Sequence, residues 1–249
     1  MRWTLLLFWT LSSLVGAGCA ASSASTAAAD GIVVRDDGPR HYEDVPEIPA
    51  RIAERLRQYQ NTRSASVAGW SADGQDLYVT TRFGDTSQLH VLGGPLGSRQ
   101  QLTFYGEPVR GAAPCPAAGG PVLITKDVGG NEAYQVFGFD PRDGRTRLLT
   151  DGESRNGSAL WSDNGAHFAY YTTRRNGKDW DIHLQDKDGN DRVLMENEGT
   201  WIPLAFSRDG AQLVVMRYYS INHSTLWLVN TASGSRAQIN PQDTHIGYG

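Results

Sequence analysis

The sequence predicts an all-β fold built from repeats of about four antiparallel strands, and three observations predict it. A pattern of an aromatic residue, Ser, any residue, Asp or Asn, and Gly recurs at residues 70–74, 161–165 and 206–210. Each copy is followed by β-rich runs that are separated by short turns containing Gly. Helical periodicity is confined to one short segment of the mature chain. Repetition at a fixed spacing is typical of proteins that stack one structural unit many times.

The first element is an export signal. An apolar run from Trp3 to Val15 follows Arg2, and the small residues 16–18 lead to Cys19. This arrangement is typical of a signal peptide, and the run is shorter than the ~20 residues of a bilayer-spanning helix. We therefore expect an exported protein.

Two ways of processing this signal remain open. Residues 15–19 resemble a bacterial lipobox, which makes Cys19 a candidate lipidation site, whereas Ala-Ala-Ala at residues 27–29 offers an ordinary cleavage site. Residues 20–29 contain only Ala, Ser and Thr, a composition that cannot bury enough apolar surface to fold. The prediction is a signal peptide and tether over residues 1–29, and a mature protein that is either periplasmic or a lipoprotein facing the periplasm.

The second element is a short helix within an N-terminal segment, residues 30–63. Ile52, Leu56 and Tyr59 follow one another at helical spacings after a proline that suits a helix start, which predicts a helix over residues 49–60. We expect this apolar stripe to be poorly covered by the rest of the chain.

The remaining elements are repeats of about 45 residues. The aromatic residue that opens each copy of the pattern is called its leader, and the leaders Trp70, Trp161 and Phe206 are spaced by 91 and 45 residues. Because 91 is about twice 45, a degenerate copy of the pattern is expected near Cys115. Each repeat holds about four strands, which is the blade of a β-propeller, and the leaders are expected to fill the small core of each blade. The predicted propeller covers residues 64–249, with blades at about 64–104, 109–150, 156–196 and 201–240.

The register of the repeats also predicts the start of a fifth blade from about residue 244. The ring is therefore expected to be incomplete, with apolar faces of the first and fourth blades uncovered.

Composition excludes several classes of function. The formal net charge of −4 provides no basic field for nucleic acid. Two cysteines exclude a disulfide scaffold and a four-thiolate metal site. No Gly-x-Ser-x-Gly nucleophile motif occurs, and the closest string, residues 152–156, fails at its last position. The six histidines have no metal-ligand spacing. No catalytic, cofactor-binding or metal-binding residue is nominated, and no cofactor is expected.

Four features that could suggest a site are assigned structural roles. His90 and His183 occupy equivalent repeat positions, and repeats reuse packing positions more readily than they duplicate sites. The acidic run at residues 186–191 and the basic run at residues 174–179 each contain a Gly of a tight turn, so both are interpreted as hairpin tips. Cys115 is interpreted as a small buried residue.

Several short segments together resemble a known family. They are residues 61–65, 81–84, 101–104, 130–132 and 149–152, with residues 155–177 as the most specific stretch. The chain from about residue 46 to 249 resembles the propeller half of bacterial prolyl oligopeptidase family serine peptidases, in the acylaminoacyl-peptidase and dipeptidyl-aminopeptidase-like branch. The repeated aromatic-Ser-x-Asp-Gly pattern is shared with TolB-like periplasmic propellers.

The resemblance implies a propeller that gates an α/β-hydrolase active site whose Ser, Asp and His follow in sequence. None of these residues lies in this chain, so no family site residue is carried over. The prediction is the substrate-gating propeller of an exported serine oligopeptidase, inactive alone, with peptide substrates reached through a hydrolase domain absent from this chain. The alternative is a stand-alone TolB-like propeller that binds protein partners, and a hydrolase with an unrecognised triad is a third reading. Membrane contact is expected only through a lipid at Cys19.

Overall fold

The computed structural model describes residues 26–27, 32–37 and 40–241, and the chain divides into two compact units, Met1–Thr62 and Arg63–Gly249. The predicted signal peptide, apart from two residues of its tether, and the candidate lipidation site Cys19 lie outside the described residues. In the part of the chain that the structure describes, no helix is long and apolar enough to cross a bilayer.

The first unit contains one helix and a small antiparallel sheet. Helix α1 (Ala50–Gln60) confirms the predicted helix, and Ile52, Leu56 and Tyr59 are exposed on it. The sheet has the order β1-β2-β3, with strands β1 (Thr26–Ala27), β2 (Val33–Asp37) and β3 (Arg40–Glu43). No sequence pattern predicts this sheet, and β1 falls in the segment interpreted as a tether. Strands of two to five residues carry too short a pattern to be recognised.

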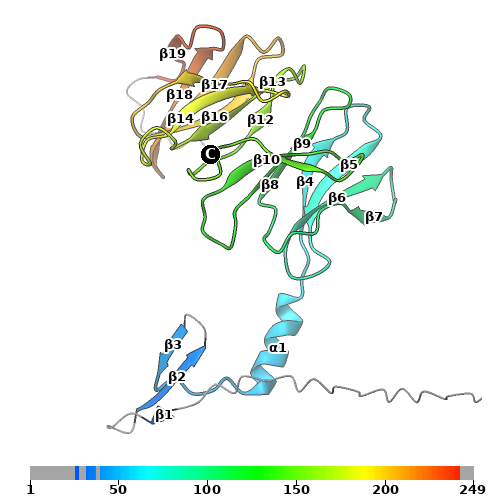
Figure 1. Ribbon diagram of the computed structural model, residues 1–249, viewed down its shortest axis with the longest axis vertical. Coiled ribbons are helices and arrows are strands. Elements are labelled where there is room, and N and C mark those ends of the chain that lie inside the picture. Colours follow the sequence, from blue (N-terminus) through cyan, green and yellow to red (C-terminus); the bar gives the residue numbers. More distant parts are fainter. Residues whose placement is uncertain (1–25, 28–31, 38–39, 242–249) are drawn as a thin grey trace, which may run out of the picture. The chain divides into compact units, whose positions relative to one another are not determined.

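The second unit consists of four four-stranded antiparallel sheets, called blades 1 to 4, which follow one another in chain order (Figure 1). Blade 1 contains β4 (Ala65–Trp70), β5 (Asp76–Thr81), β6 (Gln88–Gly93) and β7 (Arg99–Gln101). Blade 2 contains β8 (Gly111–Pro114), β9 (Val122–Lys126), β10 (Gln135–Phe139) and β11 (Thr146–Leu148). Blade 3 contains β12 (Leu160–Trp161), β13 (His167–Thr172), β14 (Asp181–Asp186) and β15 (Asp191–Met195). Blade 4 contains β16 (Thr200–Phe206), β17 (Gln212–Ser220), β18 (His223–Asn230) and β19 (Arg236–Gln238). The four predicted blades are confirmed, and the predicted start of a fifth blade lies outside the described residues.

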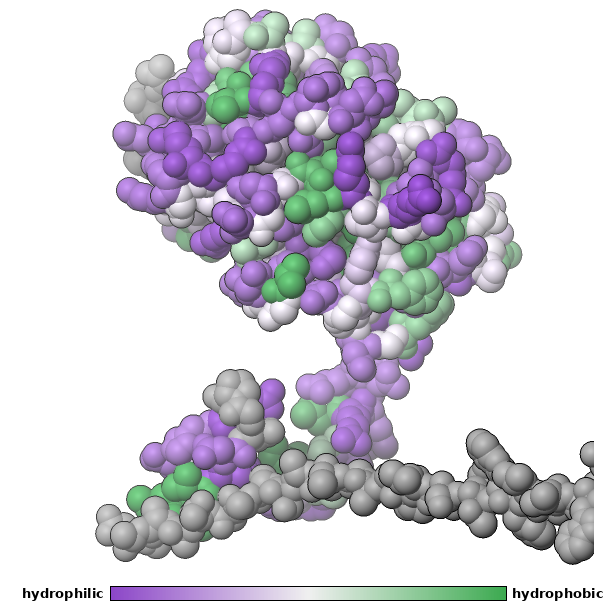
Figure 2. All heavy atoms as spheres, viewed as in Figure 1, coloured by the Kyte–Doolittle hydropathy of each residue, from purple (hydrophilic) through white to green (hydrophobic). Residues whose placement is uncertain are grey.

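The hydrophobic core lies between the blades. The first strand of each of blades 2 to 4 packs on the blade before it: β8 on β4 and β5, β12 on β8, and β16 on β12, β13 and β14. One cluster of buried apolar side chains fills each junction, centred on Leu89 and Ile124 between blades 1 and 2, on Leu123 and Phe168 between blades 2 and 3, and on Ile182 and Leu213 between blades 3 and 4. In the view of Figure 2 the surface of this unit is mostly polar, with separate apolar patches. Burial between blades therefore holds the array together.

The repeated Ser-x-Asp-Gly pattern closes the hairpin between the first two strands of a blade. In blade 1 the hydroxyl of Ser71 donates to Asp73 (2.6 Å) and accepts from the amide of Asp76 (2.9 Å), while Gly74 adopts a φ of 70° that an L side chain rarely takes. Blades 3 and 4 repeat the bond from Ser to Asn or Asp at 2.8 and 2.6 Å. The pattern is therefore a turn that satisfies its own polar groups.

Two expectations about the leaders are wrong. In blade 1 the amide of Ser71 donates to the carbonyl of Asp76 and closes the turn, and in blade 2 the amide of Cys115 donates in the same way to the carbonyl of Pro121. Cys115 is therefore the equivalent of Ser71, and the leader of blade 2 is Pro114 and not Cys115. The turn of blade 2 is one residue longer, and this shifted the spacing. Trp70 was expected in a core, yet it is 59% exposed, because a leader packs on the preceding blade and blade 1 has none among the described residues.

Candidate functional site

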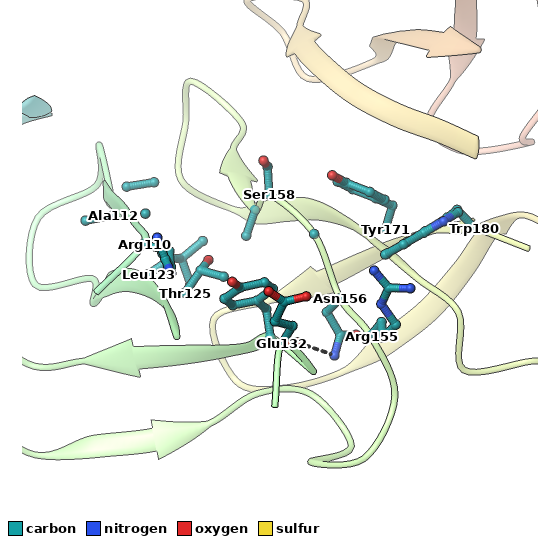
Figure 3. A pocket seen from close by; sticks show the side chains of 15 residues that line it. Arg110, Ala112, Leu123, Thr125, Glu132, Arg155, Asn156, Ser158, Tyr171 and Trp180 are labelled. Carbon is teal, nitrogen blue, oxygen red and sulfur yellow. Dashed lines mark hydrogen bonds between the residues drawn. The ribbon is translucent and has the colours of Figure 1, made fainter. Parts of the chain in front are cut away.

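A pocket with a volume of about 740 Å³ lies between blades 2 and 3, where strands β8 and β12 begin (Figure 3). Such a volume is typical of pockets that hold small molecules or short peptide segments. Its lining consists of Arg110, Gly111, Ala112, Ala113, Leu123, Thr125, Glu132, Tyr134, Arg155, Asn156, Gly157, Ser158, Ala159, Tyr171 and Trp180. Charged, aromatic and small residues meet here, which distinguishes the pocket from the apolar junction beneath it.

Asn156 fixes the wall of the pocket that comes from blade 3. Its side-chain amide is buried and donates to the carbonyls of Tyr134 and Ser154, both at 3.0 Å, and approaches the Gln135 side-chain oxygen at 3.1 Å. The loop before β12 is thereby tied to blade 2. Since buried amide groups must find partners, this residue positions the loop rather than a ligand.

Gly157 lets an aromatic side chain cross the same loop. A Cβ atom at this position would lie 1.9 Å from the ring of Tyr171, so only glycine fits there. The Tyr171 ring in turn contacts Trp180, with 4.8 Å between ring centroids. The two rings form an aromatic wall, and burial raises the pKa of the Tyr171 hydroxyl, which keeps it neutral.

Two arginines and one glutamate provide the charge of the pocket. The guanidinium of Arg155 lies 5.7 Å from the ring centre of Trp180, and Arg110 and Glu132 stand on other parts of the lining (Figure 3). Among the described residues these three side chains form no ion pair, so their charges are available to a ligand. The lining therefore suits a ligand that carries an anionic group beside an apolar one.

A second polar cluster lies within blade 3 and is partly buried. Asp191 accepts hydrogen bonds from Arg174 (2.6 Å) and Tyr170 (3.0 Å) and contacts Nδ1 of His183 at 3.1 Å. Burial opposes ionisation of Asp191, but the bonds from His183, Arg174 and Tyr170 outweigh it and lower its pKa to about 2. His183 is held between Asp191 and Arg174 rather than beside a nucleophile, which agrees with the structural role expected from its repeat position.

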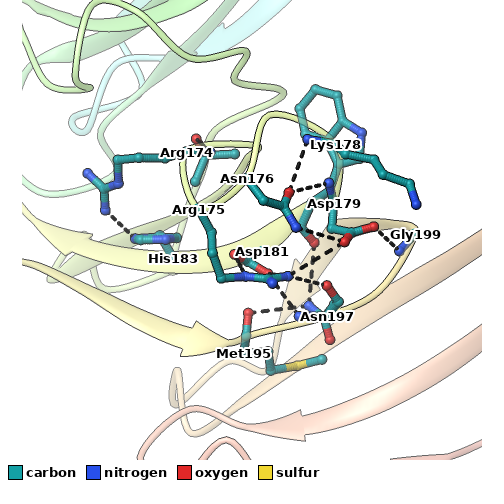
Figure 4. A network of polar contacts seen from close by, with 12 residues as sticks. Arg174, Arg175, Asn176, Lys178, Asp179, Asp181, His183, Met195, Asn197 and Gly199 are labelled. Atoms are coloured by element: carbon teal, nitrogen blue, oxygen red, sulfur yellow. Dashed lines mark hydrogen bonds and ion pairs between the residues drawn. The ribbon is translucent and has the colours of Figure 1, made fainter.

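The predicted basic hairpin tip is the turn between β13 and β14 (Figure 4). Gly177 in this turn adopts a φ of 73°. Arg175 at this turn forms a bidentate ion pair with Asp181 at 2.8 and 3.1 Å and donates to the carbonyl of Asn197 at 2.6 Å. This arginine therefore joins the turn to the segment that leads into blade 4.

The predicted acidic tip, residues 186–191, is a turn closed by Asp186, whose carboxylate accepts from the amides of Asp188 and Asn190, both at 2.9 Å. No group of three metal-binding side chains occurs within residues 26–27, 32–37 and 40–241. Cys115 is buried, as expected, and burial raises the pKa of its thiol.

His90, the repeat equivalent of His183, is also buried, and its Nδ1 lies 3.0 Å from the Gln88 carbonyl. Burial lowers its pKa, so the ring stays neutral. Its structural assignment agrees with this packing.

Sequence reasoning did not nominate the pocket residues. Arg155, Asn156 and Gly157 belong to the stretch that is most specific for the family resemblance, and Glu132 belongs to its segment 130–132, but no sequence pattern points to Arg110 or Trp180. One feature of the sequence could have indicated them, because the pocket residues lie outside the Ser-x-Asp-Gly pattern that the blades share.

Comparison with solved structures shows the fold. TolB from Acinetobacter baumannii matches with a TM-score of 0.56 and 15% identity, covering 87% of this chain and 50% of that one. Putative TolB from Agrobacterium tumefaciens matches with a TM-score of 0.58 and 17% identity, covering 87% of this chain and 79% of that one. A structure from a study of two prolyl endopeptidases matches with a TM-score of 0.60 and 14% identity, over 77% and 32%.

The chain thus has a β-propeller fold like that of TolB proteins and of part of a prolyl endopeptidase. It spans about half of the Acinetobacter TolB and about a third of the prolyl endopeptidase. No protein-family model and no curated protein matches it.

Proposed function

We propose that this propeller is the peptide-binding and substrate-gating part of an exported serine oligopeptidase. The observation that supports the proposal most is the pocket between blades 2 and 3, whose aromatic wall and unpaired charges suit a peptide. The fold shared with part of a prolyl endopeptidase supports the same context.

The chemistry of the lining supports a peptide rather than a purely apolar ligand. Arg110 and Arg155 can each donate several hydrogen bonds to a carboxylate, and Glu132 can accept from an amide or amine. Tyr171 and Trp180 offer flat surfaces to an apolar side chain. A short peptide carries all of these groups.

Calorimetric titration of short peptides with a free carboxyl end into the chain tests this function. We expect Arg155→Ala to weaken binding about tenfold, equivalent to ~1.4 kcal/mol. Arg208→Ala, at an exposed turn of blade 4, is the matched control and should bind as the parent does. No peptide binding, or equal loss in both variants, would contradict the proposal.

The chain is proposed to have no hydrolytic activity of its own, because it lacks the nucleophile motif. Chromogenic aminoacyl substrates should remain intact. Hydrolysis of these substrates that copurifies with this polypeptide and is abolished by a serine-directed phosphonate would instead favour an unrecognised catalytic triad.

A TolB-like module that binds a protein partner is the second candidate. It is favoured by the match to putative TolB from Agrobacterium tumefaciens, of which the chain covers 79%. Retention of a folded protein partner without affinity for short peptides would favour this candidate.

Export is part of the proposal, and the leader at residues 1–29 is its support. The intact mass of the protein from its native source distinguishes lipidation at Cys19 from simple cleavage near residues 27–29. A mass that includes residue 1 would contradict export through this leader.

A further inference from the structure

Another pocket lies between blades 3 and 4 and has a volume of about 370 Å³. We call it the arginine pocket, and its lining consists of Arg175, Glu196, Asn197, Glu198, Trp201, Arg217 and Arg236. Trp201 and Val229 belong to the apolar cluster of this junction, and Arg217 and Arg236 stand directly opposite them in the strand register. All four side chains therefore share the face of blade 4 that meets blade 3.

Two guanidinium groups converge on one indole ring in the arginine pocket. Trp201 is buried, and the Cζ atoms of Arg217 and Arg236 lie 5.3 and 4.8 Å from its ring centre. Arg217 also lies over the ring of Tyr219, at 4.6 Å from its centre. Asn197, which belongs to the network in Figure 4, accepts from Nη1 of Arg236 at 2.7 Å. Rings and a neutral amide therefore hold both cations in place, and the guanidinium groups keep N–H donors for a ligand.

The carboxylates around this pocket leave it with a net positive charge. Arg175 is engaged by Asp181, and this hydrogen bond, with a smaller contribution from the charge of Glu196, raises the pKa of the Arg175 guanidinium. Within the described part of the chain, neither of the other two arginines forms an ion pair, and Glu198 is the only other carboxylate of the lining. Two arginines therefore face one glutamate, and one further anionic group would balance them.

The repeat contains a filled version of this site between blades 1 and 2. Lys126 on β9 and Arg217 on β17 occupy equivalent positions in the register with the following strand. Lys126 is paired with Glu107 at 3.4 Å, which neutralises it within the chain. Glu107 lies in the connection 102–110 that leads into blade 2, whereas only residues 196–199 lead into blade 4. The shorter connection places no carboxylate in contact with Arg217, and the arginine pocket is left open beside it.

We propose that the arginine pocket binds one carboxylate group of a ligand, held by Arg217 and Arg236 over the ring of Trp201. The parallel N–H groups of a guanidinium match the two oxygens of a carboxylate. Glu198 disfavours a ligand that carries a second negative charge, such as phosphate. An acidic side chain of a peptide and a free organic acid present the same group, and the experiment below separates them. This site is distinct from the pocket between blades 2 and 3.

Calorimetric titration of the full chain, in a buffer without carboxylates, tests the site. The first probe is the tripeptide acetyl-Ala-Glu-Ala-amide, whose only charge is its side-chain carboxylate, and the second probe is acetate. We expect the tripeptide to bind and its Gln analogue to bind about tenfold more weakly. Tighter binding of the tripeptide than of acetate identifies an acidic side chain as the ligand, and equal affinity identifies a free organic acid. Absence of binding by both probes overturns the proposal.

Substitutions assign the binding to the arginine pocket. Arg217→Gln should weaken binding of the tripeptide about tenfold, whereas Arg208→Gln, at an exposed turn of the same blade, should bind as the parent does. Tyr219→Glu places a carboxylate beside Arg217 and should abolish binding, and Tyr219→Gln should retain it. Unchanged binding in Arg217→Gln overturns the proposal, as does equal loss in both Tyr219 variants.

Discussion

The side chains that recur at equivalent positions mostly satisfy polar backbone groups. In blade 1 the hydroxyl of Thr103 donates to the Gln88 side chain (2.8 Å) and accepts from the amide of Leu89 (2.9 Å). In blade 2 Thr150 and Gln135 form the same side-chain hydrogen bond, with 2.6 Å between their side-chain oxygens. This bond holds the end of the outer strand to the third strand, and leaving these buried groups unpaired would lower the stability of the fold. Segments that resemble a peptidase family therefore include residues that serve the blade itself.

Acid should weaken blade 3 through Asp191. The pKa of Asp191 is about 2 in the folded state and ~3.9 in an unfolded chain. The ionised carboxylate therefore stabilises the fold fully at pH values above ~3.9. The stabilisation, roughly 2 kcal/mol at neutral pH, is lost as pH falls from about 4 to 2. Urea unfolding across this range should show the loss.

Asp191→Asn should remove most of that pH dependence and destabilise the protein at pH 7. An undiminished slope in the variant would show that other carboxyl groups carry the acid sensitivity.

A methyl group at residue 157 should disturb the pocket. Gly157→Ala places a Cβ atom against the Tyr171 ring, and overpacking of this kind costs about 1–3 kcal/mol. Thermal unfolding should report the loss together with weaker peptide binding. Gly106→Ala is the matched control, since a Cβ atom there meets nothing within 4 Å. Equal stability of the two variants would mean that Tyr171 moves aside without cost.

At the scale of elements, the blades were predictable and the pocket was not. The Ser-x-Asp-Gly turns recur at nearly fixed spacing, and so does the apolar run that begins at Leu89 in blade 1 and at Val136 in blade 2. Strand order and blade limits therefore follow from the local pattern. The pocket combines Arg110, Glu132 and Trp180, which come from different blades or turns and have no common spacing. Only packing of one blade on the next brings them together. The sheet β1-β2-β3 was missed because its strands are short.

The two tryptophan leaders should differ in their effect on stability. Trp161 fills the junction of blades 2 and 3, so Trp161→Ala should cost about 3–5 kcal/mol. Trp70 stands at the same repeat position but is 59% exposed, so Trp70→Ala should change the stability of the chain by less than about 0.5 kcal/mol. Denaturant titrations of the two variants make the comparison. Similar losses in the two variants would mean that Trp70 is packed within its own chain.

At the scale of the whole molecule, the division into two units limits which parts can unfold together. The blades share continuous junction cores, whereas helix α1 has no buried residue. Proteins open first where few apolar contacts hold the chain, so Met1–Thr62 should open at a lower free energy than the four-blade array.

Limited digestion with trypsin should separate the two units at Arg63. This residue is exposed at the boundary of the units, just before β4, and cleavage needs a segment that can leave its structure locally. Arginines within α1 add earlier cuts but do not change the final boundary, because the helix buries none of its residues. Mass spectrometry should find a persistent fragment that begins at Ser64 and retains all four blades. Arg63→Gln should delay its appearance, whereas initial cuts at Arg145 or Lys187, in the turns of blades 2 and 3, would show that the blades open before the boundary does.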